Sequence, residues 1–187
     1  IHKLIAMLVH AHQLFLVESG SEVPDGDYVI WAPEYNKALS SNYSGYYNAG
    51  VDVTETSGKL SGYGKTEIWT VTNNDDGTIS ISFGGQKLGM QDSYSSMPLG
   101  SKNDQWVLED AGSGLYYVKN TARGAYIEWY NSKDYWSGYN KISSGSEGMF
   151  ALKFTPAEEE KEYTVPDGEY VIWAPAYNKA LSAEYPN

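Results

Sequence analysis

Residues 25–31 read DGDYVIW, a glycine turn followed by a strand with alternating side chains. The same arrangement recurs as DGTISISF at residues 76–83 and as GSGLYYV at residues 112–118. In each case a turn and a second strand follow, and short β-prone runs separated by Gly, Asn, Asp and Ser continue with no helical period. This pattern predicts three hairpins and an all-β sandwich or barrel.

Each hairpin is followed by a closing strand that carries a large ring. These strands lie at residues 67–71, 104–108 and 148–154, and their rings are Trp69, Trp106 and Phe150. The chain therefore divides into units of 25–74, 75–111 and 112–156. Because aromatic side chains bury a large area, we expect the three rings to fill the bottom of one shared barrel.

Threefold repetition of such units resembles the β-trefoil and, more distantly, the ricin-type sugar-binding trefoils, whose units close on a Gln-x-Trp motif. This chain departs from that motif, because Gln105 directly precedes Trp106 and the other two units have no glutamine there. The resemblance implies a β-trefoil-like barrel over residues 23–156. It carries no sugar-binding residue over to this sequence.

The stretches 46–54, 123–130 and 136–144 are also similar in style to accessory modules of secreted, multidomain bacterial proteins, where such modules are appended to phosphoesterase or other hydrolase domains. This second resemblance implies a secreted or cell-surface bacterial protein. It names no ligand.

An internal repeat sets the predicted domain boundaries. Residues 23–43 recur at residues 165–185 with 17 of 21 positions identical. We therefore predict an acidic linker at 157–164, with a short helical extension as its alternative, and the truncated start of a second module copy at 165–187. Because this copy cannot bury its apolar face alone, we expect it to take the place of residues 23–43 in the same barrel or in a neighbouring molecule. The second case predicts a strand-exchanged dimer through residues 165–187.

Residues 1–22 differ from the rest of the chain. Leu4, Leu8 and Ala11 follow helical spacing and Gly20 offers a stop, which predicts a helical N-terminal extension. His10 and His12 interrupt the apolar run, so a signal peptide is disfavoured, and the segment is too short and polar to span a bilayer. The tail of a preceding domain, or a segment foreign to the module, fits better.

Composition excludes several classes of function. The net charge of −11 disfavours nucleic acid as a partner, and the absence of cysteine excludes disulfides and thiolate sites. All 3 histidines lie within the first 12 residues, so the predicted barrel has no imidazole for a triad or a zinc site. Residues 73–77 (NNDDG) favour a hairpin turn over a calcium loop. We therefore expect no enzyme, no metal and no cofactor.

The densest aromatic and polar cluster lies between residues 126 and 140, and exposed rings beside carboxylates and amides suit carbohydrate. We expect Trp136 or Trp129 to stack on a sugar, with Asp134, Asn140 and Glu128 as polar partners. The predicted ligand-binding set is Trp129, Trp136, Tyr130, Tyr135, Tyr139, Asp134, Asn140 and Glu128. The alternative is that these rings cover the open end of the barrel or contact a neighbouring module.

A second aromatic cluster lies in the first unit, where Trp31 is expected to pack inside the module. The predicted secondary ligand-binding residues are Tyr35, Asn36, Tyr46 and Tyr47. Together the two clusters favour a non-catalytic module that binds a glycan or cell-surface polysaccharide, without membrane insertion. The alternative is a protein-interaction or structural spacer module that contacts adjoining domains or a host protein.

Overall fold

The computed structural model describes residues 23–142 and 148–158, together with residues 168–169, 171–174, 176 and 179–180. Within these residues the regular structure is β, apart from single turns of 3-10 helix, as the sequence predicts. The elements are β1 (Gly26–Ala32), β2 (Lys37–Tyr43), β3 (Asn48–Asp52), β4 (Thr54–Thr56), β5 (Lys59–Ser61), η1 (Lys65–Glu67), β6 (Ile68–Asn73), β7 (Ile79–Phe83), β8 (Gln86–Lys87), β9 (Trp106–Gly112), β10 (Leu115–Asn120), β11 (Tyr126–Tyr130), η2 (Asn131–Lys133), β12 (Tyr135–Tyr139), β13 (Gly148–Met149), β14 (Ala151–Pro156), β15 (Trp173–Ala174) and β16 (Lys179–Ala180).

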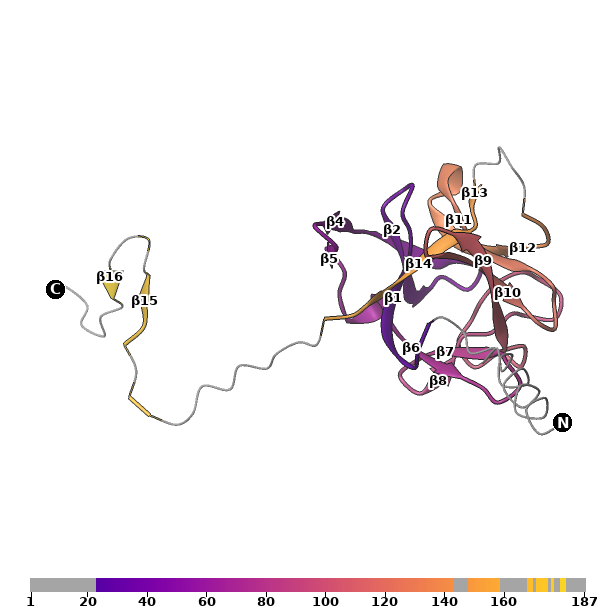
Figure 1. Ribbon diagram of the computed structural model, residues 1–187, viewed down its shortest axis with the longest axis horizontal. Coiled ribbons are helices and arrows are strands. Elements are labelled where there is room, and N and C mark those ends of the chain that lie inside the picture. Colours follow the sequence, from indigo (N-terminus) through magenta and orange to yellow (C-terminus); the bar gives the residue numbers. More distant parts are fainter. Residues whose placement is uncertain are drawn as a thin grey trace, which may run out of the picture. The chain divides into compact units, whose positions relative to one another are not determined.

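Six of these strands close into a barrel (Figure 1). Going round it, β1 pairs with β6, β6 with β7, β7 with β9, β9 with β10, β10 with β14, and β14 with β1 again. All six pairings are antiparallel. Each predicted unit contributes its first and its last strand, so the three units share one closed sheet that has no free edge.

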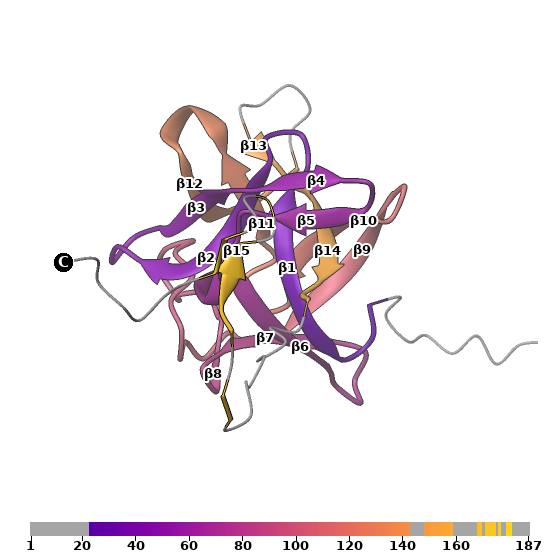
Figure 2. The same ribbon diagram turned by 90° about the vertical axis from the view of Figure 1, so that its left-hand side faces the viewer.

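Hairpins between the barrel strands cap one end of the barrel. The first unit supplies β2–β3 and the third supplies β11–β12. In the second unit, β8 is followed by isolated bridges from Leu88 to Leu99 and from Met90 to Asn103. β12 pairs with β3 through Trp136 and Asn48, so the caps of units one and three join along a seam (Figure 2). Six barrel strands with three caps form a β-trefoil.

The register of the barrel corrects the predicted triad of rings. Trp69 lies opposite Tyr28, and Trp106 lies opposite Ile79. In the third unit the residue opposite Tyr116 is Leu152. Trp69, Trp106 and Leu152 are all fully buried, so a leucine stands where a third ring was expected.

Phe150 lies two residues before Leu152, outside β14. It is buried, but it stands outside the main core cluster, and its ring packs near that of Tyr139 with centroids 6.4 Å apart. The prediction was wrong for Phe150 because the third closing strand is shifted by two residues. Such a shift keeps the same face of the strand, so alternation alone cannot detect it.

The two tryptophans of the triad are anchored by hydrogen bonds. Trp69 Nε1 donates to the carbonyl oxygen of Leu39 at 2.8 Å, and Trp106 Nε1 donates to that of Leu88 at 3.0 Å. The first bond joins β6 to β2, and the second joins β9 to the residue that follows β8. Because a buried indole N–H needs an acceptor, these bonds hold each cap onto the barrel.

The chain forms two compact units, Ile1–Ala157 and Glu158–Asn187. In the second unit, β15 pairs with β16 through Trp173 with Ala180 and Ala174 with Lys179. This register repeats that of β1 and β2 in the first copy. The predicted helix at 1–22 and most of the predicted linker lie outside the described residues, and the strand-exchanged dimer stays a prediction.

Candidate functional site

Trp129 and Trp136 are both fully buried, which corrects the expectation that one of them stacks on a sugar from the surface. They lie opposite each other on β11 and β12, with ring centroids 5.5 Å apart. Trp136 Nε1 donates to the carbonyl oxygen of Ala38 at 3.0 Å. Alternation along both strands turns these rings inward, and the cap of unit one covers them.

Close backbone contact explains how this covering is achieved. A Cβ atom added to Gly50 on β3 would lie 2.3 Å from Cζ3 of Trp129. Only a residue without a side chain allows β3 to approach the indole this closely. The sequence left open the alternative that these rings cover the end of the barrel. Trp129 and Trp136 fit that alternative.

The opposite face of β11–β12 carries Glu128, Tyr130, Tyr135 and Tyr139 of the predicted cluster. Glu128 lies opposite Ser137, in the middle of this face, and both side chains are buried. Burial raises the pKa of Glu128 from its ordinary value of 4.5 to about 7. Glu128 is therefore not the exposed polar partner that the sequence predicted.

A cleft of about 430 Å³ opens along the seam between the caps of units one and three. We call it the seam cleft. It contains residues from both of the clusters that the sequence predicts, because the β3–β12 pairing brings those clusters together. Its lining residues are Asn42, Tyr43, Ser44, Tyr47, Asn48, Ala49, Asp134 and Tyr135.

Tyrosine rings form one wall of the seam cleft. Tyr47 and Tyr135 stack with ring centroids 3.7 Å apart and 13° between their planes. Tyr130 packs edge-on against Tyr135 at 5.8 Å, and Tyr46, which is 67% exposed, lies 6.2 Å from Tyr47. Burial, assisted by the neighbouring Tyr47, raises the pKa of Tyr135 to about 12. The four rings together present an apolar surface edged by hydroxyl groups.

The tip of the β2–β3 hairpin is fixed by local hydrogen bonds. The backbone N–H of Ser44 donates to the carbonyl oxygen of Tyr47 at 2.9 Å, and the hydroxyl of Tyr43 donates to that of Gly45 at 2.8 Å. These bonds close the turn between the two strands. They set the position of Tyr47 at the mouth of the cleft.

A lysine holds the carboxylate of the seam cleft in place. Lys37 Nζ lies 3.2 Å from Asp134 Oδ1 and 2.9 Å from Asp52 Oδ1. Burial opposes the charge on Lys37, but the hydrogen bonds to both carboxylates outweigh it and raise its pKa. Asp134 itself has a positive φ of 56° at the end of η2. The carboxylate is thus oriented and remains exposed.

Asn48 supplies a buried amide at the base of the seam cleft. Its Nδ2 donates to the carbonyl oxygen of Ser40 at 3.3 Å. Its Oδ1 is buried and has no hydrogen-bond partner among the described residues. A buried acceptor without a donor is unfavourable, so this oxygen has an unmet need for a hydrogen-bond donor.

Several predicted residues lie outside the seam cleft. Tyr139 and Asn140 are exposed beyond its far end, and Tyr139 lies opposite Tyr126. Tyr35 packs against the core, and Asn36 accepts a hydrogen bond from the backbone N–H of Val53 through its carbonyl oxygen. Trp31 is buried, as expected. These residues shape the module and do not line the cleft.

The sequence did not single out Asn42, Ser44 or Ala49. One feature of the sequence does distinguish Asn42, because it is one of the four positions at which the two copies of the repeat differ. No such feature distinguishes Ser44 or Ala49, because only the seam between units one and three places them beside Asp134.

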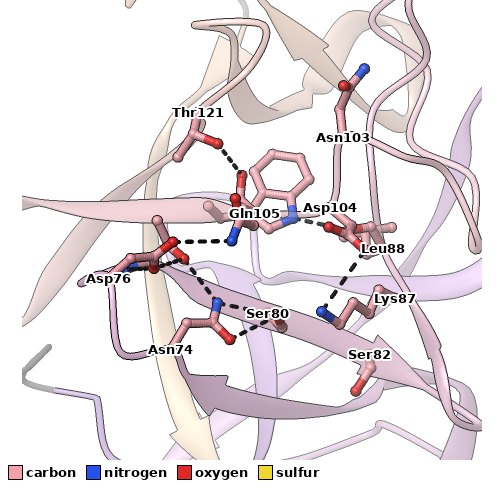
Figure 3. A network of polar contacts seen from close by, with 12 residues as sticks. Asn74, Asp76, Ser80, Ser82, Lys87, Leu88, Asn103, Asp104, Gln105 and Thr121 are labelled. Carbon is pink, nitrogen blue, oxygen red and sulfur yellow. Dashed lines mark hydrogen bonds and ion pairs between the residues drawn. The ribbon is translucent and has the colours of Figure 1, made fainter.

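A polar network elsewhere in the barrel has a structural role (Figure 3). Gln105 Nε2 donates to Asp76 Oδ2 at 3.2 Å, and Thr78 donates to Asp76 Oδ1 through its hydroxyl at 2.6 Å. The hydrogen bonds from Thr78 lower the pKa of Asp76. Gly77 N–H donates to the carbonyl oxygen of Asn74, so residues 74–77 form the turn between β6 and β7. The predicted hairpin turn is confirmed.

No protein family model matches the chain, and no curated protein matches it. Solved structures match its fold. SeviL, bound to asialo-GM1 saccharide, has a TM-score of 0.53 at 16% identity, over 72% of this chain and 99% of SeviL. The designed threefold-symmetric protein ThreeFoil has a TM-score of 0.53 at 18% identity, over 71% of this chain and all of ThreeFoil (100%).

An endo-β-galactosidase from Clostridium perfringens that releases GlcNAcα1-4Gal has a TM-score of 0.56 at 16% identity. The match covers 71% of this chain and only 32% of that enzyme. At these identities the likenesses show the fold alone. They confirm the predicted β-trefoil fold. Among the described residues, no helix is long and apolar enough to cross a membrane.

Proposed function

We propose that this chain is a non-catalytic carbohydrate-binding module and that the seam cleft holds the glycan. The observation that carries the proposal is the combination of a tyrosine wall with an oriented carboxylate and an unpaired amide oxygen in one cleft. Sugars have apolar C–H faces and hydroxyl edges, so a site for them combines aromatic surface with fixed polar groups.

Each lining group has a role in this proposal. The exposed edge of the Tyr47–Tyr135 stack packs against the C–H face of a sugar. Asp134, held by Lys37, accepts hydrogen bonds from sugar hydroxyls, and the amide of Asn42 takes both donor and acceptor roles. A hydroxyl that enters the cleft supplies the donor that Asn48 Oδ1 lacks.

The fold and the cleft chemistry both support binding over catalysis. SeviL, which shares the fold, is bound to a saccharide. Glu128 has the raised pKa that a general acid needs, but it is buried and is not among the residues that line the seam cleft. Asp134 is paired with Lys37. The cleft therefore offers no pair of facing carboxyls for glycoside hydrolysis.

We also propose that the module belongs to a secreted or cell-surface bacterial protein. The support is the similarity to bacterial accessory modules and the endo-β-galactosidase, in which the matching fold takes up only 32% of a larger bacterial enzyme. A small single cleft of this kind binds with an affinity near millimolar, about −4 kcal/mol. Repetition of the module would add avidity.

A glycan array with the full chain tests the proposal. Asn42→Ala and Tyr47→Ala remove cleft groups, whereas Asn140→Ala and Tyr139→Ala remove exposed groups outside the cleft. We expect a roughly tenfold loss of binding for each cleft variant, as for a lost ~1.4 kcal/mol contact. The control variants should bind like the parent. Absence of any glycan signal, or equal losses in both pairs, would overturn the proposal.

A protein-interaction module is the second candidate function. The observation in its favour is that Tyr46 and Tyr94 are each 67% exposed, which is high for aromatic side chains. In that case Tyr46→Ser and Tyr94→Ser abolish capture of a protein ligand, and the glycan array stays blank.

A further inference from the structure

The C-terminal copy of the repeat exposes apolar side chains that are buried in the first copy. Val171 is 77% exposed and Ile172 is 66% exposed. The equivalent residues of the first copy, Val29 and Ile30, have no exposed area. The two copies thus share the same apolar sequence, which is covered in the first copy, whereas Val171 and Ile172 are exposed among the described residues of the second.

The barrel shows what covers that surface in the first copy. β1 lies between β6 and β14, with Val29 opposite Ile68 on one side and Thr155 on the other. Ile30 lies opposite Phe154 and belongs to the main core cluster. We call the place that β1 and β2 occupy, with β1 between these two strands and β2 beside β3, the first-hairpin slot.

The sequence of the second copy fits the first-hairpin slot. Residues 23–43 and 165–185 differ at four positions, and in the first copy these are Asp27, Glu34, Ser41 and Asn42. None of the four is buried. Every buried residue of β1 and β2 has an identical counterpart in the second copy, and β15–β16 already has the register of β1–β2.

We propose that residues 165–185 compete with residues 23–43 for the first-hairpin slot of the same chain. β14 ends beside the start of β1, where the backbone N–H of Ala157 donates to the carbonyl oxygen of Asp27 at 2.8 Å. Residues 157–164 can span about 26 Å, whereas Asp27 and Val23 are at most about 14 Å apart along the chain. The connection is therefore long enough for the second copy to enter the slot beside β14.

Competition within one chain is favoured over exchange between two chains. Each chain has one barrel and two first hairpins, so a strand-exchanged dimer also leaves one hairpin per chain uncovered. Exchange therefore gains no apolar burial over closure within the chain, and it loses the entropy of association. Closure by the second copy would also place Glu184 at the position of Asn42 in the seam cleft.

Disulfide trapping tests this proposal, because the chain has no cysteine. Thr70 lies opposite Asp27, and its hydroxyl donates to Asp27 Oδ1 at 2.6 Å. Glu169 is the counterpart of Asp27. The trap is the full chain with Thr70→Cys and Glu169→Cys, and the positive control is Thr70→Cys with Asp27→Cys. The matched control, Thr72→Cys with Glu169→Cys, displaces the thiol by two residues along β6, beyond disulfide reach.

We expect the trap to form a disulfide within the monomer at least tenfold faster than the matched control. Adding Ile30→Asp, which disables the first copy, should raise the rate of the trap further. Equal rates for trap and matched control, in both backgrounds, would overturn the proposal. A disulfide-linked dimer would overturn closure within the chain and establish exchange between chains instead.

Discussion

The ring of Tyr47 stacks on the ring of Tyr135, with centroids 3.7 Å apart. Tyr47 is at the tip of the first unit's cap, and Tyr135 begins β12 in the third unit. The stack therefore forms only when both caps are in place. It couples the wall of the seam cleft to the closure of the whole barrel.

This stack predicts an energetic coupling between the two residues. In a double-mutant cycle of Tyr47→Leu and Tyr135→Leu, the two losses of unfolding free energy should differ from additivity by about 0.5–1.5 kcal/mol. Urea unfolding of the four proteins measures this coupling. Strict additivity would show that the rings do not stack in solution.

Contact between Gly50 and Trp129 predicts that β3 tolerates no side chain at this position. Gly50→Ala would place a methyl group 2.3 Å from the indole, so the cap or the ring must move. We expect a loss of about 1–3 kcal/mol in unfolding free energy. Gly26→Ala is the matched control, because its nearest contact would be an ordinary 3.4 Å from Tyr28. Similar stabilities for both variants would contradict the prediction.

Burial of Glu128 predicts that stability falls as pH rises. The folded-state pKa of about 7 lies above the ordinary value of 4.5, so the folded protein binds more protons than the unfolded chain between these values. Stability from this group is full below about pH 4.5 and is lost as pH rises through 7, with a total on the order of 3 kcal/mol.

Glu128→Gln should remove this dependence. The variant is expected to resemble the parent at pH 4 and to be more stable than it at pH 8. Thermal unfolding of both proteins across this range gives the comparison. A parallel decline of parent and variant with pH would assign the dependence to other groups.

Complete burial of Trp136 predicts a loss of stability and not a selective loss of binding. Trp136→Ala leaves a large cavity and removes the hydrogen bond to the carbonyl oxygen of Ala38, at a cost of about 3–5 kcal/mol. Tyr139→Ala, which removes an exposed ring on the same strand, should change stability much less. If Trp136→Ala keeps parental stability, the packing described for this indole is incorrect.

Much of the fold could be predicted from local patterns. A glycine turn before an alternating strand, repeated three times, is enough to predict three hairpins, and Trp69 and Trp106 were expected inside the barrel and lie there. Phe150 and Leu152 lie two residues apart, so alternation along the closing strand does not distinguish them. Only pairing with Tyr116 distinguishes them.

The candidate site was predicted less well, because exposure depends on contacts between units. Three residues that were expected to bind ligand do line one cleft: Tyr47, Asp134 and Tyr135. Trp129 and Trp136 were expected on the surface, since nothing near them in sequence accounts for their burial. Their cover comes from Gly50 and Ala38, in another unit of the chain.

The amino-acid sequence by itself determined the strand texture, the three units and the near-identity of residues 23–43 and 165–185, because turns and alternation are properties of neighbouring residues. Tertiary structure alone decided which rings are buried and which line a cleft. The cause is the pairing of β3 with β12, which brings together residues distant in the chain. These residues exclude water from one face of the β11–β12 hairpin and leave the other face open.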